Sequence, residues 1–160
     1  MIIIKPTHSE EAPHLVRWFE EPGVLRWFPM INEREVEDAV RLWMAYCKMG
    51  STLTAYKEGK PCGMALLYLQ PFKKLAHQCL FSIIVDAQQR GQGIGSQLLN
   101  ALERIAKEKF HIELLHLEVY DGNPAKRLYE RQGFQEYGRQ EHFVKEEGVY
   151  RAKIFMQKVL

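Results

Sequence analysis

The sequence predicts an α+β protein in which one mixed β-sheet carries helices on its faces. Two observations predict this class. Apolar residues follow a strand pattern in seven stretches and a helical pattern in four others. The strands also occur both in hairpins and around helices, which requires antiparallel and parallel pairing in one sheet. The chain has 160 residues, and we expect a single domain over residues 1–160.

The first half of the chain predicts one strand, two helices and a hairpin. Residues 1–6 are β-branched and end at a proline, as a first strand would. Apolar residues at helical spacing predict a helix within residues 7–21 and another over 33–49, separated by a loop rich in aromatic residues. Residues 51–57 and 61–70 are strand-like runs around the tight turn "EGK", which is typical of a hairpin.

The second half predicts a strand, a helix, a strand, a shorter helix and a final hairpin. Residues 77–86 are apolar enough for a central strand, and a glycine-rich loop and an amphipathic helix follow them. Residues 112–120 predict another buried strand, and 123–134 a short helix that Gly133 ends. The last two strands, within residues 135–160, turn around the sequence "EEG".

Composition argues against several classes of function. The net charge is only +2 and the basic residues are spread along the chain, so we expect no nucleic-acid partner. No apolar run approaches the length of a membrane span, and the apolar start is too short for a signal peptide, so we expect a cytoplasmic protein without a membrane partner. Neither the histidines nor Cys47, Cys62 and Cys79 have metal-ligand spacing, so we expect no metal.

The stretch "VDAQQRGQGIGSQLLNALERIA", residues 85–106, places three glycines directly before a helix. A helix N-terminus exposes unpaired backbone N–H groups and a partial positive charge, and glycines let the backbone approach an anion closely. A strand, a glycine loop and a helix in this order predict a phosphate cradle. Ile94, Leu98, Leu102 and Ile105 lie on the helix face that packs on the sheet. A glycine-rich turn without a ligand is the alternative.

Two common nucleotide-binding motifs fit this loop poorly. A Walker loop requires Lys-Ser or Lys-Thr after its last glycine, whereas Ser96 and Gln97 follow Gly95 here. A Rossmann fingerprint spaces its last two glycines three apart, and it usually follows the first strand of a chain rather than the fourth. Both nucleotide-binding interpretations are therefore weak.

Two sequence blocks resemble the motifs of a known enzyme superfamily. Arg90, Gly93 and Gly95 match the pattern (Gln/Arg)-x-x-Gly-x-(Gly/Ala), and "LEVYDGNPAKRLYERQGF", residues 117–134, resembles a second block in the same order. Together they are similar to the GNAT superfamily, the acetyl-CoA-dependent N-acetyltransferases, over roughly residues 79–135. The resemblance implies a GNAT-like fold: a central mixed, mostly antiparallel sheet of about seven strands, two central parallel strands splayed at the cofactor cleft, and about four helices.

The resemblance implies that acetyl-CoA binds as co-substrate. Its pyrophosphate would rest on the backbone N–H groups of the glycine loop, and its pantetheine arm would pair with the strand before that loop. Asn123 matches the position that hydrogen-bonds this arm, and it can equally cap the following helix. The implied cofactor-binding residues are Ile83, Ile84, Val85, Arg90, Gly91, Gln92, Gly93, Ile94, Gly95, Ser96, Asn123 and Tyr129.

Two residues are candidates for catalysis through the same resemblance. Tyr129 matches the family's tyrosine beside the thioester sulfur; a free tyrosine has a pKa of about 10, so it can donate a proton to the departing thiolate. Packing in the core is the alternative role. Glu118 matches the base of the branch that acetylates protein N-termini, although the loop "YDGN" departs from that branch and leaves this specificity open. A hydrogen-bonded strand glutamate is the alternative for Glu118.

These residues together predict an N-acetyltransferase that moves an acetyl group from acetyl-CoA to a primary amine by direct attack in a ternary complex. The acceptor would be a small molecule, a peptide or a protein N-terminus, and a homodimer is among the assemblies left open. Trp27 and Phe28 either line the acceptor pocket or close the core. The alternative function is a coenzyme A-binding sensor without turnover, against which the presence of Tyr129 argues.

Overall fold

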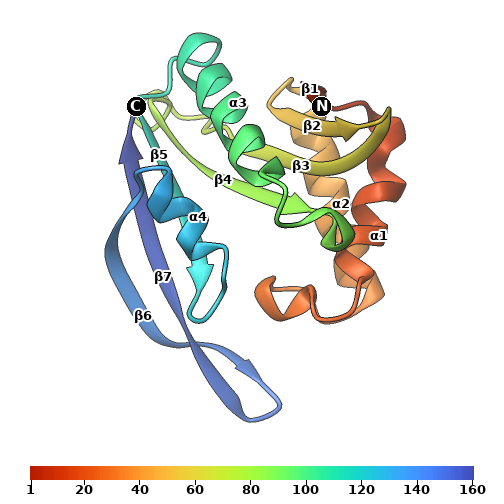
Figure 1. Cartoon of the computed structure of the whole chain (residues 1–160). Helices are drawn as coiled ribbons and strands as arrows, with labels where there is room; N and C mark the ends of the chain where they lie inside the picture. The colour runs from red at the N-terminus through yellow and green to blue at the C-terminus, as the bar shows by residue number, and fades with distance from the viewer.

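One seven-stranded sheet and four α-helices make up the computed structural model, which describes all residues from 1 to 160 (Figure 1). The order across the sheet is β1-β2-β3-β4-β5-β7-β6, so the predicted α+β class and mixed sheet are confirmed. The strands are β1 Ile2–Pro6, β2 Thr52–Lys57, β3 Lys60–Tyr68, β4 Gln78–Val85, β5 Leu114–Tyr120, β6 Gln135–Glu146 and β7 Val149–Val159. The helices are α1 Ala12–Glu20, α2 Glu33–Lys48, α3 Ile94–Glu108 and α4 Lys126–Arg131, with short 3₁₀ turns η1 Ser9–Glu11, η2 Leu25–Trp27 and η3 Ala87–Gln89.

A buried polar cluster joins the start of the chain to the sheet. The Glu11 carboxylate accepts hydrogen bonds from the Thr54 hydroxyl at 2.7 Å and from the His8 backbone N–H at 3.1 Å. The hydroxyls of Thr7 and Thr54 lie 2.8 Å apart. These bonds hold η1 against β2, and the regular helix α1 begins only after that turn.

Helices cover both faces of the sheet. Helices α1 and α2 pack on one face through a core that includes Trp18 and Val36. Helices α3 and α4 lie against the other face (Figure 1), where Leu98 and Phe134 belong to a second core. Of the apolar stripe predicted for α3, Ile94, Leu98 and Leu102 are buried in this second core, and Ile105 is partly buried against it. None of the helices is both long and apolar enough to cross a membrane.

Strands β4 and β5 are the only parallel neighbours in the sheet, and they separate soon after they meet. Their pairs are Gln78–Leu114, Cys79–Leu115 and Leu80–His116. Beyond these pairs β4 continues beside β3, while β5 continues beside β7, and the two strands diverge (Figure 1). The predicted pair of splayed parallel strands is therefore present.

The last two strands form a hairpin that extends beyond the rest of the sheet (Figure 1). Its turn lies at Glu147 and Gly148, both with positive φ, where the sequence "EEG" predicts it. Two register shifts interrupt the pairing of β6 with β7. Strand β5 pairs with β7 over the whole length of β5, and this pairing brings C-terminal side chains next to the centre of the sheet.

Candidate active site

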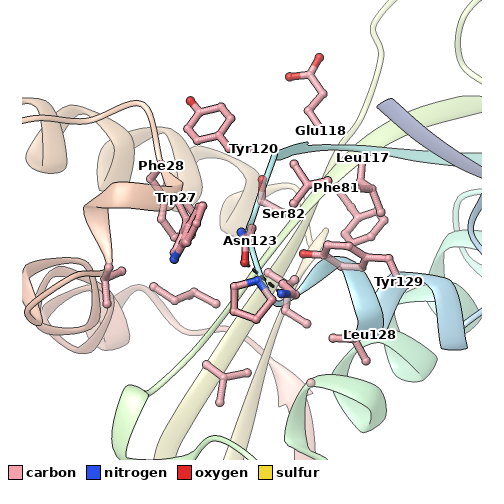
Figure 2. A pocket seen from close by; sticks show the side chains of 18 of the residues that line it. Trp27, Phe28, Phe81, Ser82, Leu117, Glu118, Tyr120, Asn123, Leu128 and Tyr129 are labelled. Atoms are coloured by element: carbon pink, nitrogen blue, oxygen red, sulfur yellow. Dashed lines mark hydrogen bonds between the residues drawn. The ribbon is translucent and has the colours of Figure 1, made fainter. Parts of the chain in front are cut away.

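A cavity of about 630 Å³ opens where β4 and β5 separate. Its walls come from the loop between α1 and α2, from β4, the glycine loop, β5 and α4 (Figure 2). Every site residue predicted from the sequence lines this cavity except Gln92, whose side chain accepts a hydrogen bond from Lys57 instead. The fold therefore brings both sequence blocks to one place.

Seven consecutive backbone N–H groups, those of residues 90 to 96, make no well-formed hydrogen bond to a backbone carbonyl, and residues 90 and 91 lie in the turn after η3. The first bond of α3 runs from the N–H of Gln97 to the carbonyl of Gly93 at 3.1 Å. Gly91 and Gly93 have φ of 75° and 77°, in the left-handed region that favours glycine. Because these free donors surround the N-terminus of a helix, the loop is suited to hold an anion.

Two glycines of this loop serve different purposes. A Cβ atom at Gly93 would meet nothing within 4 Å, so this position borders open space. A Cβ atom at Gly95 would lie 3.0 Å from Cδ2 of Leu128. The glycine at 93 thus leaves room above the loop, whereas the glycine at 95 lets α3 approach α4 closely.

Strand β4 offers free backbone groups to the cavity. The N–H of Asp86 donates to the carbonyl of Cys62 at 2.9 Å, next to the ladder with β3. Because bonded pairs alternate along an antiparallel ladder, Ile84 also bonds to β3, whereas Ile83 and Val85 direct their backbone groups away from it. These groups lie beyond the β4–β5 pairing, so an extended ligand can add to β4 there as a strand would.

Asn123 caps the segment that leads into α4. Its Oδ1 accepts a hydrogen bond from the N–H of Ala125 at 2.9 Å, and its own N–H donates to the carbonyl of Tyr120 at 3.1 Å. The capping role is therefore present, although the regular helix begins later, at Lys126. Asn123 also lines the cavity, and its Nδ2 group remains available as a donor to a ligand.

Tyr129 is buried beside the cavity, with 8% of its surface exposed. Its ring centroid lies 5.9 Å from that of Phe81 and 6.3 Å from that of Phe134. The hydroxyl points toward the side of the cavity where Asn123 lies (Figure 2). Burial raises the pKa of the Tyr129 phenol, because an apolar environment disfavours the phenolate. The hydroxyl is therefore a protonated donor at neutral pH.

Glu118 lies at the rim of the same cavity. Its side chain is 37% exposed, and Oε2 lies 2.5 Å from the ammonium of Lys153 on β7. Figure 2 shows its carboxylate directed away from the Tyr129 hydroxyl. The structure thus brings Glu118 into the cavity wall but does not bring it next to Tyr129, and it supplies a cationic partner that the sequence analysis missed.

Other polar residues of the cavity were also missed. The hydroxyls of Ser82 on β4 and Tyr68 on β3 lie 3.1 Å apart. Burial raises the pKa of Tyr68, although the hydrogen bond with Ser82 opposes this shift. Ser82 could have been found as the polar residue in an apolar central strand. No sequence signal places Lys153 opposite Tyr120, because that pairing depends on the register of β7.

The aromatic residues of the loop between α1 and α2 have both of the roles that the sequence left open. Trp27 and Phe28 line the cavity (Figure 2). Phe28 also packs edge-to-face on Phe19 of α1, with ring centroids 5.0 Å apart. The loop therefore closes the α1–α2 core with one side and forms a cavity wall with the other.

Comparison with known proteins identifies the family. The model of the acetyltransferase (GNAT) family matches residues 13–134, and the chain belongs to this family of acyltransferases. The L-amino acid N-acetyltransferase AaaT of Escherichia coli (strain K12) is 24% identical over 108 residues, which cover 67% of each chain. The resemblance deduced from the two sequence blocks is thus confirmed.

Solved structures share the whole fold. A ribosomal-protein-alanine N-acetyltransferase from Brucella melitensis has a TM-score of 0.83 at 28% identity, with 99% of both chains covered. The structure of yncA from Salmonella typhimurium, determined with its cofactor acetyl-CoA, has a TM-score of 0.84 at 20% identity, with 99% of this chain and 94% of that one covered. The predicted GNAT-like fold is therefore confirmed.

Proposed function

We propose that this GNAT protein is an acetyl-CoA-dependent N-acetyltransferase that acetylates a primary amine by direct attack in a ternary complex. The observation that carries the proposal is the cradle of free N–H groups at residues 90 to 96, which borders the same cavity as the Tyr129 hydroxyl. One part of the cavity can hold an anion and another can donate a proton. An acyl-CoA substrate needs both, because it carries a pyrophosphate far from its thioester.

The residues that would hold acetyl-CoA, which supplies the acetyl group as an activated thioester, follow one path through the cavity. Residues 90–96 would donate backbone hydrogen bonds to the pyrophosphate, and the Arg90 guanidinium would add positive charge. Ile83 and Val85 would pair with the pantetheine arm as a neighbouring strand does. The free Nδ2 group of Asn123 would donate to the same arm from the β5 side.

Proton transfers then involve two residues. Glu118 would take one proton from the acceptor ammonium and pass it to solvent, leaving a neutral amine. The amine nitrogen bonds to the acetyl carbon, the carbon–sulfur bond breaks, and the sulfur leaves with the electron pair. Tyr129 would donate its proton to that sulfur, and the second nitrogen proton would return to Tyr129 through solvent. The products are the acetylated amine and free coenzyme A, with one proton released.

The contribution of Tyr129 follows from its environment. Burial keeps the phenol protonated, so the proton is present when the thiolate forms. General acid catalysis of this kind typically accelerates a reaction by about 10²–10⁴-fold. Phe81 and Phe134 pack against the Tyr129 ring and hold it in place. Little conformational entropy is therefore lost when the hydroxyl is positioned for proton transfer.

Cleavage of acetyl-CoA in the presence of a panel of primary amines tests the proposal. We expect that free coenzyme A is released only with a suitable amine, and that one acetylated amine forms for each coenzyme A. If calorimetry shows that acetyl-CoA binds but no amine accelerates cleavage, the alternative function, a coenzyme A-binding sensor, replaces the enzyme.

A further inference from the structure

One basic residue lies in the wall of the acceptor end of the cavity, and two more lie next to it. Lys153 lines the cavity with 13% of its side chain exposed. Arg26 in η2 and Arg151 on β7 both lie near Trp27, with guanidinium carbons 5.8 and 5.4 Å from the centroid of its ring. Arg151 also donates a hydrogen bond to the carbonyl of Arg26 at 3.3 Å, which joins β7 to the loop between α1 and α2.

Lys153 has an acidic partner, whereas Arg26 and Arg151 have none. Glu118 is the only acidic residue that lines the cavity, and it already pairs with Lys153. None of the nine ion pairs of the protein includes Arg26 or Arg151. Apart from Lys153, the cationic residues of the cavity wall are Arg90 and Arg131, which belong to the glycine loop and to α4, on the side expected to hold acetyl-CoA. The wall of the acceptor end therefore carries one balanced ion pair, with two guanidinium groups without an ion-pair partner close outside it.

We infer that the acceptor is an α-amino acid with an apolar side chain, whose carboxylate binds Lys153 and whose amino group binds Glu118. This inference rests on the proposed function, and it assigns Lys153 as a specificity-determining residue. Glu118 and Lys153 are in contact, so the two groups that bind them must also be close together in the acceptor. An α-amino acid carries its ammonium and its carboxylate on one carbon, and it can exchange partners with this ion pair.

The position of Lys153 explains why it can give up its partner. Its ammonium lies 3.9 Å from the centroid of the ring of Phe143 on β6, and 5.7 Å from the centroid of the ring of Phe155 on β7. The ring faces stabilise the Lys153 ammonium and hold it at the cavity wall when Glu118 binds the ammonium of the acceptor instead. The remaining N–H groups of the ammonium can then donate to a carboxylate.

The aromatic wall accounts for the apolar side chain. Trp27, Phe28, Tyr120 and Phe143 line the same cavity as the ion pair, and Phe143 contacts the Lys153 ammonium directly. Apolar and aromatic groups are attracted to such surfaces because contact removes both from water. The apolar side chain of an acceptor can therefore pack against the rings while its amino group binds Glu118 and its carboxylate binds Lys153.

Matched acceptors test the inference by turnover. L-phenylalanine, L-phenylalaninamide and 2-phenylethylamine share a ring and an amine, but only the first carries a carboxylate. The kcat/KM for each amine is measured with saturating acetyl-CoA and is referred to total amine, because the proposed mechanism takes the proton from the bound ammonium. We expect L-phenylalanine to exceed the other two at least tenfold, since the loss of a charge-assisted contact commonly has this size. Equal or higher values for either analogue without the carboxylate would overturn the inference.

Variants at Lys153 identify the residue that reads the carboxylate. Lys153→Met removes the charge and should reduce the preference for L-phenylalanine over L-phenylalaninamide at least tenfold, while acetyl-CoA affinity is retained. Lys153→Arg keeps the charge and should restore most of the preference. Lys145→Met is the matched control, because Lys145 also lies over an aromatic ring, that of Tyr150, but outside the cavity. A preference that survives in Lys153→Met would show that another group reads the carboxylate.

A binding experiment separates failure of this inference from failure of the proposed function. Calorimetry with the protein bound to coenzyme A, which cannot transfer an acetyl group, measures L-phenylalanine and L-phenylalaninamide directly. We expect tighter binding of L-phenylalanine, and we expect Lys153→Met to remove the difference. If this preference is found but no amine is acetylated, the site is a binding site and the proposed function fails alone. If binding shows no preference, the inference fails whatever the turnover.

Discussion

The carboxylate of Asp86 accepts a hydrogen bond from the indole nitrogen of Trp18 at 3.2 Å, and this contact joins α1 to the start of the glycine loop. The other carboxylate oxygen accepts from the N–H of Gln88 at 2.9 Å and so begins η3. Arg17 adds a third donor at 3.2 Å. The buried side chain of Asp86 thus connects α1 with the loop that would hold pyrophosphate.

Replacement of Asp86 by asparagine should destabilise the protein in a pH-dependent manner. Burial by itself would raise the pKa of Asp86, but the N–H of Gln88 and the guanidinium of Arg17 outweigh it and hold the pKa below its ordinary value of 3.8. A lowered pKa contributes stability that is complete above the unfolded value and is lost as the pH falls through the folded value. We expect Asp86→Asn to lower the free energy of unfolding by about 1–3 kcal/mol near neutral pH.

Urea unfolding at about pH 7 and at about pH 3 measures this effect. The difference between wild type and Asp86→Asn should begin to narrow at the lower pH, because the Asp86 carboxyl of the unfolded chain binds a proton there while the folded carboxyl resists it. Asp38→Asn serves as the control, since Asp38 is exposed on α2 and pairs only with Arg41. A difference of the same size at both values of pH would exclude the charge of Asp86 as its source.

A negative side chain in the glycine loop should abolish tight binding of acetyl-CoA. Gly93→Asp places a carboxylate in the open space above the loop, beside the expected pyrophosphate. We expect the affinity for acetyl-CoA to fall at least tenfold, or about 1.4 kcal/mol, as measured by calorimetry. Gly148→Asp is a matched control, because Gly148 has a φ of 79°, close to the 77° of Gly93, and also borders open space, but lies at the hairpin turn.

Both variants should lose similar stability, since each places a non-glycine residue in the left-handed region at a cost of about 1–2 kcal/mol. Only Gly93→Asp should lose affinity. If both variants bind acetyl-CoA as the wild type does, the anion site lies elsewhere than at residues 90–96.

The glycine loop could be predicted from the sequence because its chemistry is local. Gly93 has a positive φ, and the free N–H groups at the start of α3 follow it directly. The apolar residues of α3 belong to the same stretch of sequence. The cap at Asn123 is local for the same reason. Such features depend on residues only a few positions apart, so neighbouring residue types are sufficient to identify them.

The acceptor end could not be predicted in the same way, because it is assembled from distant segments. Glu118 meets Lys153 only through the register of β5 against β7, and Trp27 meets Arg151 only because the loop after α1 reaches β7. Two register shifts in β6 further decide where Phe143 lies. A shift of one residue would move each of these side chains to the other face of the sheet.

Removal of the Tyr129 hydroxyl should affect the chemical step and spare binding. Tyr129→Phe keeps the ring between Phe81 and Phe134, so acetyl-CoA affinity should change little. We expect kcat to fall by about 10²–10⁴-fold where chemistry limits the rate. Because burial raises the pKa of Tyr129, wild-type activity should show no loss from its ionisation up to about pH 10.

Stopped-flow measurement of a single turnover is the appropriate assay, since it separates chemistry from product release. Tyr137→Phe is the control, because Tyr137 is 54% exposed on β6 and does not line the cavity. A single-turnover rate for Tyr129→Phe within about twofold of the wild type would remove this hydroxyl from the mechanism.

The last prediction concerns Glu118, which the structure pairs with Lys153 at the cavity rim. Glu118→Gln keeps the size of the side chain and removes its charge. We expect kcat/KM for the amine to fall and acetyl-CoA affinity to be retained, because Glu118 would act on the acceptor alone. Glu113→Gln is the control, since Glu113 is an exposed carboxylate just before the same strand and lies outside the cavity.

The dependence of the rate on pH distinguishes a base from a mere binding group. If Glu118 accepts the proton, Glu118→Gln should lower kcat at saturating amine and change the acidic side of the kcat profile, whereas a group that only binds the ammonium would affect kcat/KM alone. The acceptor amine also titrates, so two acceptors of different pKa are compared: a titration of the enzyme stays in place, and that of the amine moves with the acceptor. An unchanged rate and profile in Glu118→Gln would assign proton removal to water or to a backbone carbonyl, and Glu118 would keep only its ion pair with Lys153.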